Sequence, residues 1–277
     1  MRVEPMPPEL DIAHEPGVAK PDPVLTIDGM QRAFGGLRAV DIDHLEIQRN
    51  TITSIIGPNG AGKTTLFNLL TGFEHPDHGH YALDGELLLG VPAHQVAQRG
   101  MVRTFQLTKV LPRLTVLDNM LVAAKAQPGA TFRGAMLGGW RDAELQNEEQ
   151  ARDILERFGL SAMADEYAGR LSGGQRKLLE MARALMVMPT VVMLDEPTAG
   201  VNPVLVQSLL EHVKDLRESG MTVLFVEHNM DVVQSISDWV VVLAEGRVLA
   251  EGPPAVIARN PAVIEAYLGK HRGEDVA

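Results

Sequence analysis

TITSIIGPNGAGKTT, residues 51–65, is the stretch of sequence that decides the fold. An apolar run leads into a glycine-rich loop at Gly57, and a helical pattern follows over residues 63–70. The loop has the spacing G-x-x-x-x-G-K-S/T, with a strand before it and a helix after it, as that pattern requires. Its glycines let successive backbone N–H groups point into one concavity, and the helix N-terminus adds to the attraction for anions. The sequence therefore predicts a site for the phosphates of a nucleotide.

The predicted loop consists of Gly57, Pro58, Asn59, Gly60, Ala61, Gly62, Lys63, Thr64 and Thr65. We expect the Lys63 ammonium to reach the β- and γ-phosphates and the Thr64 hydroxyl to ligate Mg²⁺. The alternative is an ordinary glycine-rich turn that caps a helix. That alternative gives no reason for Lys63 and Thr64 to stand at these offsets.

Two further apolar runs end in residues that carry chemistry. VVML, residues 191–194, is followed by Asp195 and Glu196, and TVLFVE, residues 222–227, is followed by His228. Because ligands bind at the carboxyl edge of parallel sheets, these side chains are expected beside the phosphate loop. Asp195 can complete the Mg²⁺ shell, Glu196 can orient or deprotonate an attacking water, and His228 can bond the γ-phosphate. The alternative is a solvated strand end with a structural histidine.

LSGGQ, residues 171–175, opens a helix that Ser172 is well placed to cap. Read locally, it is only a capped helix. Gly173 and Gly174, however, destabilise a helix start unless the bare backbone is needed, for instance to approach phosphate. Since the chain already contains one phosphate loop, a second anion-binding helix end, with Gln175 in it, suggests a nucleotide shared with another subunit.

The order of elements predicts a layered α/β core interrupted by a helical insert of about residues 90–171. The Pro-rich residues 1–23 are interpreted as a flexible, disordered tail, with the folded domain beginning near Val24. Expected strands cover residues 24–30, 40–47, 51–57, 190–196, 221–228 and 239–252, and residues 80–86 are hairpin-like. Expected helices include residues 63–70, 92–98 and 203–219.

Composition excludes several classes of function. The 277 residues include no cysteine, which excludes disulfides, thiolate metal sites and cysteine catalysis. A net charge of −11 disfavours a nucleic-acid partner, because neutralising phosphates takes a basic surface. No apolar run is long enough to span a bilayer. A local basic group, formed by Arg99, Arg103, Lys109 and Arg113, is interpreted as a solvated face or a docking surface.

Together these motifs resemble the ATP-binding cassette (ABC) ATPases over about Val24 to Gly269, which leaves residues 270–277 as a C-terminal tail. GPNGAGKT at residues 57–64 is similar to the Walker A loop, LSGGQ to the ABC signature, and VVMLDEP at residues 191–197 to Walker B. The resemblance implies a RecA-like P-loop core with an antiparallel β subdomain and an inserted helical subdomain. ATP and Mg²⁺ are the ligands it implies.

The resemblance also assigns roles to single residues. Glu196 is implied as the catalytic base and His228 as the switch histidine. Gln106, in RTFQ, is similar to the Q-loop glutamine that joins the Mg²⁺ shell with Thr64 and Asp195. Phe34 stands where the family has an aromatic residue that stacks on adenine. Most members have Tyr there, and Phe keeps the stacking face.

In this family two cassettes bind head to tail and enclose two ATP molecules. Ser172, Gly173, Gly174 and Gln175 would therefore contact the nucleotide of the partner cassette. Asn202 departs from the family pattern, because it stands at the D-loop position usually held by Asp. Asn keeps the capacity for hydrogen bonding but not the charge.

Several stretches resemble the longer ATPase of branched-chain, or hydrophobic, amino acid importers. They include FGGLRAVD (residues 34–41), EHNMDVV (227–233) and NPAVIEAYLG (260–269). The implied partners are two transmembrane permease subunits, a second ABC ATPase, and indirectly a substrate-binding protein. For the second ATPase an unlike subunit is favoured over a second copy. The implied location is cytoplasmic, peripheral on the inner face of the cell membrane.

Three alternatives stay open at this point. One is an ABC ATPase for urea, short amides or another solute. Another is a soluble cassette protein that acts on ribosomes or DNA, although such proteins usually carry two cassettes or coiled-coil insertions. The third is a nucleotide sensor that does not hydrolyse ATP, which the presence of both Glu196 and His228 disfavours.

Overall fold

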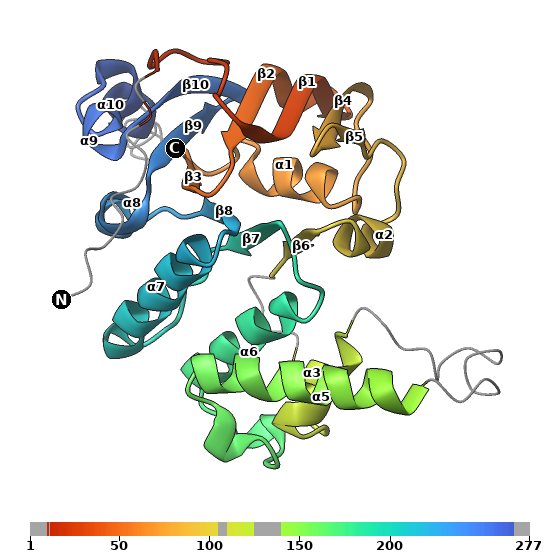
Figure 1. Cartoon of the computed structure of the whole chain (residues 1–277). Coiled ribbons are helices and arrows are strands. Elements are labelled where there is room, and N and C mark those ends of the chain that lie inside the picture. The colour runs from red at the N-terminus through yellow and green to blue at the C-terminus, as the bar shows by residue number, and fades with distance from the viewer. Residues whose placement is uncertain (1–9, 11, 105–109, 125–139, 269–277) are drawn as a thin grey trace.

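The computed structural model describes residue 10 and residues 12–104, 110–124 and 140–268 of the chain. Figure 1 shows two lobes, one that contains the strands and one that is built from helices. The predicted α/β class is confirmed. Within the described residues, no helix combines the length and apolar character that crossing a bilayer requires.

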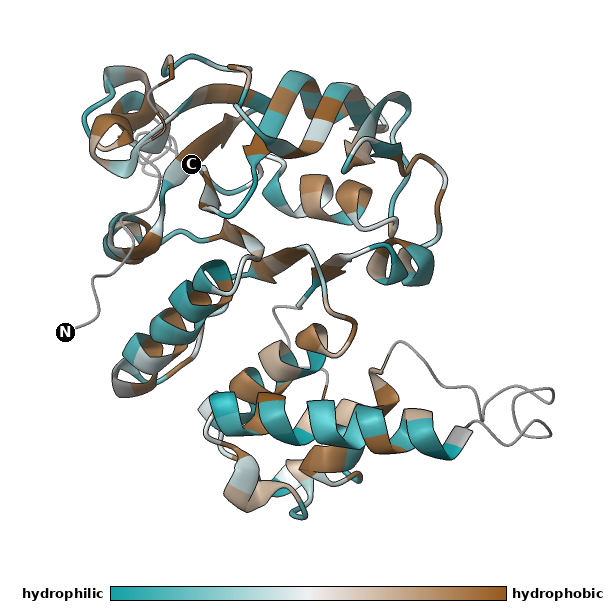
Figure 2. Cartoon of the chain, viewed as in Figure 1, coloured by the Kyte–Doolittle hydropathy of each residue, from teal (hydrophilic) through white to brown (hydrophobic). Residues whose placement is uncertain are grey.

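A six-stranded sheet forms the centre of the first lobe. Its strands lie in the order β10 (Arg247–Gly252), β9 (Trp239–Ala244), β3 (Ile52–Ile56), β8 (Thr222–Val226), β7 (Val191–Asp195) and β6 (Met101–Arg103). Neighbouring strands are parallel except β9 and β10, which form an antiparallel hairpin. Strands β3, β7 and β8 are buried along their whole length and predominantly hydrophobic in Figure 2. Their carboxyl ends meet at one edge of the sheet.

A second sheet is antiparallel and covers one side of the core. Its strands lie in the order β2 (Leu37–Gln48), β1 (Pro23–Phe34), β4 (His78–Leu83) and β5 (Glu86–Leu87). Helix α1 (Lys63–Leu70) begins and ends where the sequence predicts it. Its apolar residues belong to one core cluster with residues of both sheets, so α1 packs between them.

The remaining helices cover the other faces. The helical lobe contains α3 (Val116–Val122), α5 (Trp140–Arg157), α6 (Gly173–Leu185) and 3₁₀ turns at Ser161–Met163 and Ala168–Arg170. Around the six-stranded sheet lie α2 (Ala93–Gln98), α7 (Pro203–Glu218), α8 (Met230–Ile236), α9 (Pro254–Ile257) and α10 (Pro261–Leu268). One apolar cluster joins α3, α5, α6 and α7 to the sheet, whereas α8, α9 and α10 pack on β9 and β10.

The structure differs from the expected helical insert of residues 90–171 at both ends. Helix α2 packs against β6, and β6 pairs with β7 inside the core sheet, so the insert begins after β6. Helix α6 contacts α3 and α5, so the helical lobe also extends beyond residue 171. A three-residue strand is too short for an apolar period to reveal it.

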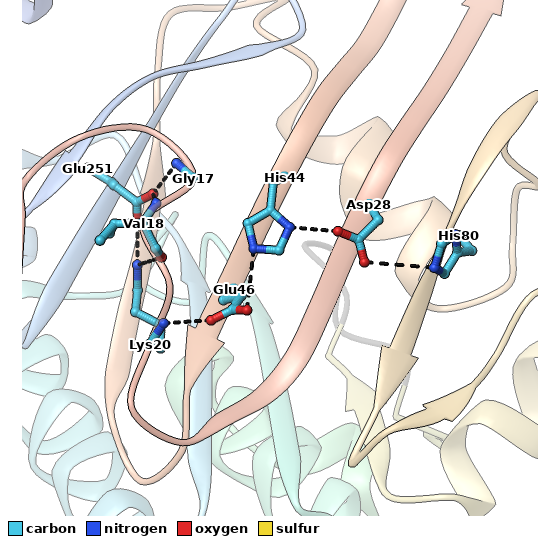
Figure 3. Close-up of polar contacts among 8 residues, drawn as sticks. All are labelled: Gly17, Val18, Lys20, Asp28, His44, Glu46, His80 and Glu251. Carbon is cyan, nitrogen blue, oxygen red and sulfur yellow. Dashed lines mark hydrogen bonds and ion pairs between the residues drawn. The ribbon is translucent and has the colours of Figure 1, made fainter.

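The structure also differs from the expected flexible tail over residues 12–22, which we call the N-terminal segment. Lys20 Nζ forms an ion pair with Glu251 Oε2 at 2.6 Å, and the two side chains are 1% and 0% exposed. The Gly17 N–H donates to Glu251 Oε1 at 2.7 Å, and the Lys20 N–H donates to Glu46 Oε2 at 2.5 Å (Figure 3). The Pro-rich composition gave no sign of this docking, because its partners lie far away in the sequence.

Glu251 is the centre of this contact. Besides Lys20 and the segment backbone, it accepts a hydrogen bond from Trp239 Nε1 at 2.9 Å. Lys20 Nζ lies 4.8 Å from the centre of the Trp239 ring, which adds a cation–π contact. A buried carboxylate is tolerated only when its oxygens are paired, and here the N-terminal segment supplies most of the donors.

Lys20→Ala should therefore lower the free energy of unfolding by about 3 kcal/mol or more, because it leaves the Glu251 carboxylate buried without its cation. Urea unfolding measures the change. The matched control is Arg152→Ala, which breaks the exposed pair of Arg152 with Glu148 and should cost about 0.5 kcal/mol or less. Equal losses in the two variants would contradict the docking of the segment.

Candidate functional site

The phosphate loop joins β3 to α1, as the sequence predicts. Gly57, Gly60 and Gly62 have φ angles of 151°, 78° and 98°, a region that side chains rarely adopt. Gly62 is the N-cap of α1, in the left-handed conformation. The chain turns at these glycines and presents the first turn of α1 to solvent.

Two of the glycines have a second role, which the motif alone does not reveal. A Cβ on Gly57 would lie 2.1 Å from the Leu243 carbonyl oxygen, and a Cβ on Gly62 would lie 2.2 Å from the Ala39 carbonyl oxygen. Gly60 meets nothing within 4 Å. The loop is thus held between the end of β9 and strand β2, with Gly60 at its open side.

Lys63 and Thr64, the predicted ligands of phosphate and metal, are the first two residues of α1. Lys63 Nζ donates to the carbonyl oxygens of Gly57 at 2.6 Å and Pro58 at 3.0 Å, which holds the ammonium across the loop. Thr64 is exposed at the start of α1. Its hydroxyl is therefore accessible to a hard cation such as Mg²⁺.

The carboxyl ends of β7 and β8 bring the strand-end residues together beside the loop. Asp195 pairs with Val226 in the sheet register, and His228 Nδ1 lies 3.9 Å from Glu196 Oε1. Glu196 has a φ of 45°, a strained backbone for a side chain of this size. His228 is 64% exposed at its side chain and Glu196 is 25% exposed. An acid and an imidazole thus face the solvent next to the loop.

Arg103 is a member of this site that sequence reasoning misassigned. Its placement on a solvated basic face is wrong, because its side chain is only 6% exposed. Its guanidinium donates to Asp195 Oδ2 and to Asn68 Oδ1, both at 2.6 Å. A buried Asp195 requires a cation nearby, and β6, which was not predicted, brings one.

Glu227 is a second residue of the site to which the sequence analysis assigned no role. It is 1% exposed, and its Oε1 accepts a hydrogen bond from the Thr198 hydroxyl at 2.5 Å. Burial raises the pKa of Glu227, and Thr198 and the adjacent His228 oppose the rise. Glu227 thereby ties the end of β8 to the turn that follows Glu196.

The LSGGQ residues form a capping box at the start of α6. Ser172 Oγ accepts from the Gln175 N–H at 3.2 Å, and Gln175 Oε1 accepts from the Ser172 N–H at 2.9 Å. A Cβ on Gly174 would lie 2.3 Å from Leu205 Cδ1, whereas Gly173 faces open space. The helix start is exposed at Ser172 and Gly173, where the predicted contact with a partner cassette would lie.

Phe34 ends β1 and is 46% exposed. The Arg32 guanidinium lies 4.7 Å from the centre of its ring, and Arg32 is itself paired with Glu74 and Asp77.

Gln106, the expected Q-loop glutamine, lies outside the described residues.

Tyr267 of α10 lies near Gly57 of the loop. Burial raises the pKa of the Tyr267 hydroxyl, and the Gly57 backbone opposes the rise. Within the described residues this hydroxyl is buried and forms no hydrogen bond. Tyr267 also packs on the apolar cluster that includes Ile56, the residue before the loop.

Taken together, the geometry supplies a phosphate cradle, a lysine, two oxygen ligands suited to Mg²⁺ and an acid–imidazole pair. This combination can bind a nucleoside triphosphate and activate a water against its terminal phosphate. The family model described as "ABC transporter" matches residues 40–199, more than half of the chain. The chain belongs to the ABC transporter family.

Two relatives are similar to this chain over nearly their whole length. The branched-chain amino acid transport ATP-binding protein BraF of Pseudomonas aeruginosa is 43% identical over 251 residues, covering 90% of this chain and 98% of the relative. LivG of Escherichia coli K12 is 42% identical with the same coverage. A second family model, "Branched-chain amino acid ATP-binding cassette transporter", matches residues 247–272.

Solved structures agree with the fold. The ADP conformation of an ATP-binding cassette of an ABC transporter aligns with a TM-score of 0.77 and 35% identity, over 89% of this chain and 99% of that one. The predicted ABC cassette fold is therefore confirmed, and ATP hydrolysis is the reaction of this cassette.

Glu227→Gln should raise stability at neutral pH. Because folding raises the pKa of this acid, its ionisation disfavours the folded state. The contribution of Glu227 to the free energy of unfolding is therefore complete below its pKa in the unfolded chain. It is lost as the pH rises through its pKa in the folded protein. The amide removes that loss and still accepts from Thr198. The gain, followed by urea unfolding from acid to neutral pH, should vanish at the acid end. A gain independent of pH would contradict a buried, ionising Glu227.

Proposed function

We propose that this cassette is the ATPase subunit of an importer of branched-chain amino acids. The observation that carries the proposal is the match of residues 247–272 to the branched-chain model, together with relatives of that name that align over their whole length. These residues include α9 and α10, and α10 brings Tyr267 to the phosphate loop.

In the proposed mechanism the loop binds the phosphates of ATP through backbone N–H groups, and Lys63 moves from the loop carbonyls to the β- and γ-phosphates. Thr64, Asp195 and Gln106 would hold Mg²⁺, and the exposed Thr64 hydroxyl and the buried Asp195 carboxylate are oxygen donors that suit it. When bound, Mg²⁺ supplies positive charge against the phosphate oxygens. Phe34, which is 46% exposed and has Arg32 against its ring, would stack on adenine.

Hydrolysis is assigned to Glu196 and His228. The Glu196 carboxylate accepts the proton of the attacking water as its oxygen bonds to the γ-phosphorus. The bond from that phosphorus to the bridging oxygen breaks, so ADP leaves, and His228 bonds the γ-phosphate and stabilises the charge that develops there. The γ-phosphate held by the partner cassette is contacted by the LSGGQ residues Ser172, Gly173, Gly174 and Gln175. ATP binding thus closes a head-to-tail dimer, and hydrolysis reopens it.

The proposed partners are two permease subunits, a second, unlike ATPase and, indirectly, a substrate-binding protein. A groove of about 400 Å³ lies beside β6 and α2, lined mainly by apolar surface that includes the 55% exposed Phe73, with Ala97 and Met101. We propose this apolar groove as a contact surface for a permease subunit. The cassette is then peripheral on the inner face of the membrane.

The experiment that tests the function is affinity purification of the tagged protein from gently solubilised native membranes, followed by uptake assays with the purified complex. The expected result is two multi-spanning permeases, a second ATPase, and ATP-dependent uptake of leucine, isoleucine or valine. Uptake of urea or an amide instead would overturn the substrate. Ribosomes or DNA without a membrane protein would overturn transport.

Glu196→Gln should lower the ATP turnover rate by about 100-fold or more while ATP binding is preserved, because only the proton acceptor is removed. Phosphate release and an equilibrium ATP titration measure the two properties. The control is Glu218→Gln, an exposed acid at the end of α7, which should change neither. Turnover like that of the unmodified protein in Glu196→Gln would remove this residue from its role.

A further inference from the structure

Arg103 is the residue at which separate parts of the nucleotide site meet. It is the last residue of β6, and its side chain is buried. Nη1 donates to Asn68 Oδ1 and Nη2 donates to Asp195 Oδ2, each at 2.6 Å. The Phe67 ring lies 5.4 Å from the guanidinium carbon. Two hydrogen bonds and the neighbouring aromatic ring fix the orientation of the planar Arg103 guanidinium.

Asn68 connects this guanidinium to the phosphate loop. It lies four residues after Thr64 on α1, so both side chains project from the same face of the helix. Thr64 and Asp195 are the two described residues assigned to Mg²⁺, and they come from different elements. The Arg103 guanidinium spans from the helix that carries Thr64 to the strand that carries Asp195.

The contact also leaves one oxygen of Asp195 for a metal. Arg103 donates to Oδ2. Within the described part of the chain Oδ1 accepts no hydrogen bond, and it is not sealed from solvent. A carboxylate held through one oxygen presents the other in a defined direction. Groups that orient a ligating carboxylate in this way change metal affinity by about 10- to 100-fold when they are replaced.

We propose that Arg103 is a positioning residue for the Mg²⁺ of the nucleotide site. Its bridge between Asn68 and Asp195 sets the spacing of the Thr64 hydroxyl and the Asp195 carboxylate and directs Oδ1 toward the metal. The inference rests on the proposed function, in which these two residues hold Mg²⁺ with ATP. It assigns a role to an arginine that stands three residues before Gln106 in the sequence.

The test measures ATP affinity at a series of Mg²⁺ concentrations and in EDTA, in a Glu196→Gln background so that bound ATP persists. In Arg103→Lys, one ammonium cannot replace the two-pronged contact, so the Mg²⁺ concentration at half-saturation should rise by about 10- to 100-fold. ATP affinity in EDTA should stay unchanged. Asn68→Leu, which removes the other end of the bridge, should shift the same value in the same direction by less.

The control is Arg99→Lys, whose side chain forms a more exposed pair with Glu86 at 3.2 Å and should leave both measurements unchanged. Thermal unfolding without nucleotide or metal adds a readout independent of the loaded site. There Arg103→Lys and Asn68→Leu should be non-additive, because they break the same bridge.

Equal loss of ATP affinity with and without Mg²⁺ would make Arg103 a merely structural residue and overturn the proposal. So would an unchanged Mg²⁺ requirement in Arg103→Lys when Asp195→Asn raises that requirement. An unchanged requirement in Asp195→Asn itself would instead overturn the proposed metal site. The failure of this inference is thereby distinguishable from the failure of the proposed function.

Discussion

The rest of the structure depends on the close approach of two carbonyl groups to the phosphate loop. The Leu243 oxygen reaches Gly57 from β9, and the Ala39 oxygen reaches Gly62 from β2, at distances that exclude any Cβ. The Gly246 N–H donates to the Ala61 carbonyl oxygen, and Gly246 in turn accepts from the Asp41 N–H. The antiparallel sheet is therefore one wall of the loop, and the β9–β10 hairpin is the other. A loop held from both sides can keep its N–H groups converged without a ligand, which lowers the ordering cost of binding phosphate.

Sequence reasoning succeeded where a feature depends on local spacing. The helix over Lys63–Leu70 and the strands that end at Asp195 and near His228 follow from apolar runs, turn residues and the phosphate-loop pattern. It could not find β6, because three residues show no period, and without β6 it could not place Arg103 beside Asp195. The one available signal was an arginine at the end of the apolar pair Met101 and Val102. This signal places Arg103 in the site only if Asp195 is already known to be buried and to need a cation.

Several motif residues also stabilise the fold. The spacing of a motif alone therefore does not distinguish a residue's structural role from its role in binding or catalysis. Ser172 and Gln175 satisfy each other in a capping box, and Gly174 admits the Leu205 side chain from α7. Glu196 keeps a positive φ, while the buried Glu227 and Thr198 join the end of β8 to the turn beyond it. The strain at Glu196 is thus held by the surrounding strands, an arrangement typical of a residue whose direction matters for chemistry.

Both described ends of the chain converge on the hairpin that walls the loop. The N-terminal segment is fixed by Lys20 to Glu251 of β10, and Glu251 also binds Trp239 of β9. Beyond β10 the chain enters α9 and α10, and Tyr267 of α10 packs against the apolar cluster that includes Ile56, the residue before the loop. A displacement of β10 would move the support of Gly57 and the attachment of the N-terminal segment together. Residues 247–268, the described part of the stretch that matches the branched-chain model, therefore pack beside the start of the phosphate loop through Tyr267 and the cluster that includes Ile56.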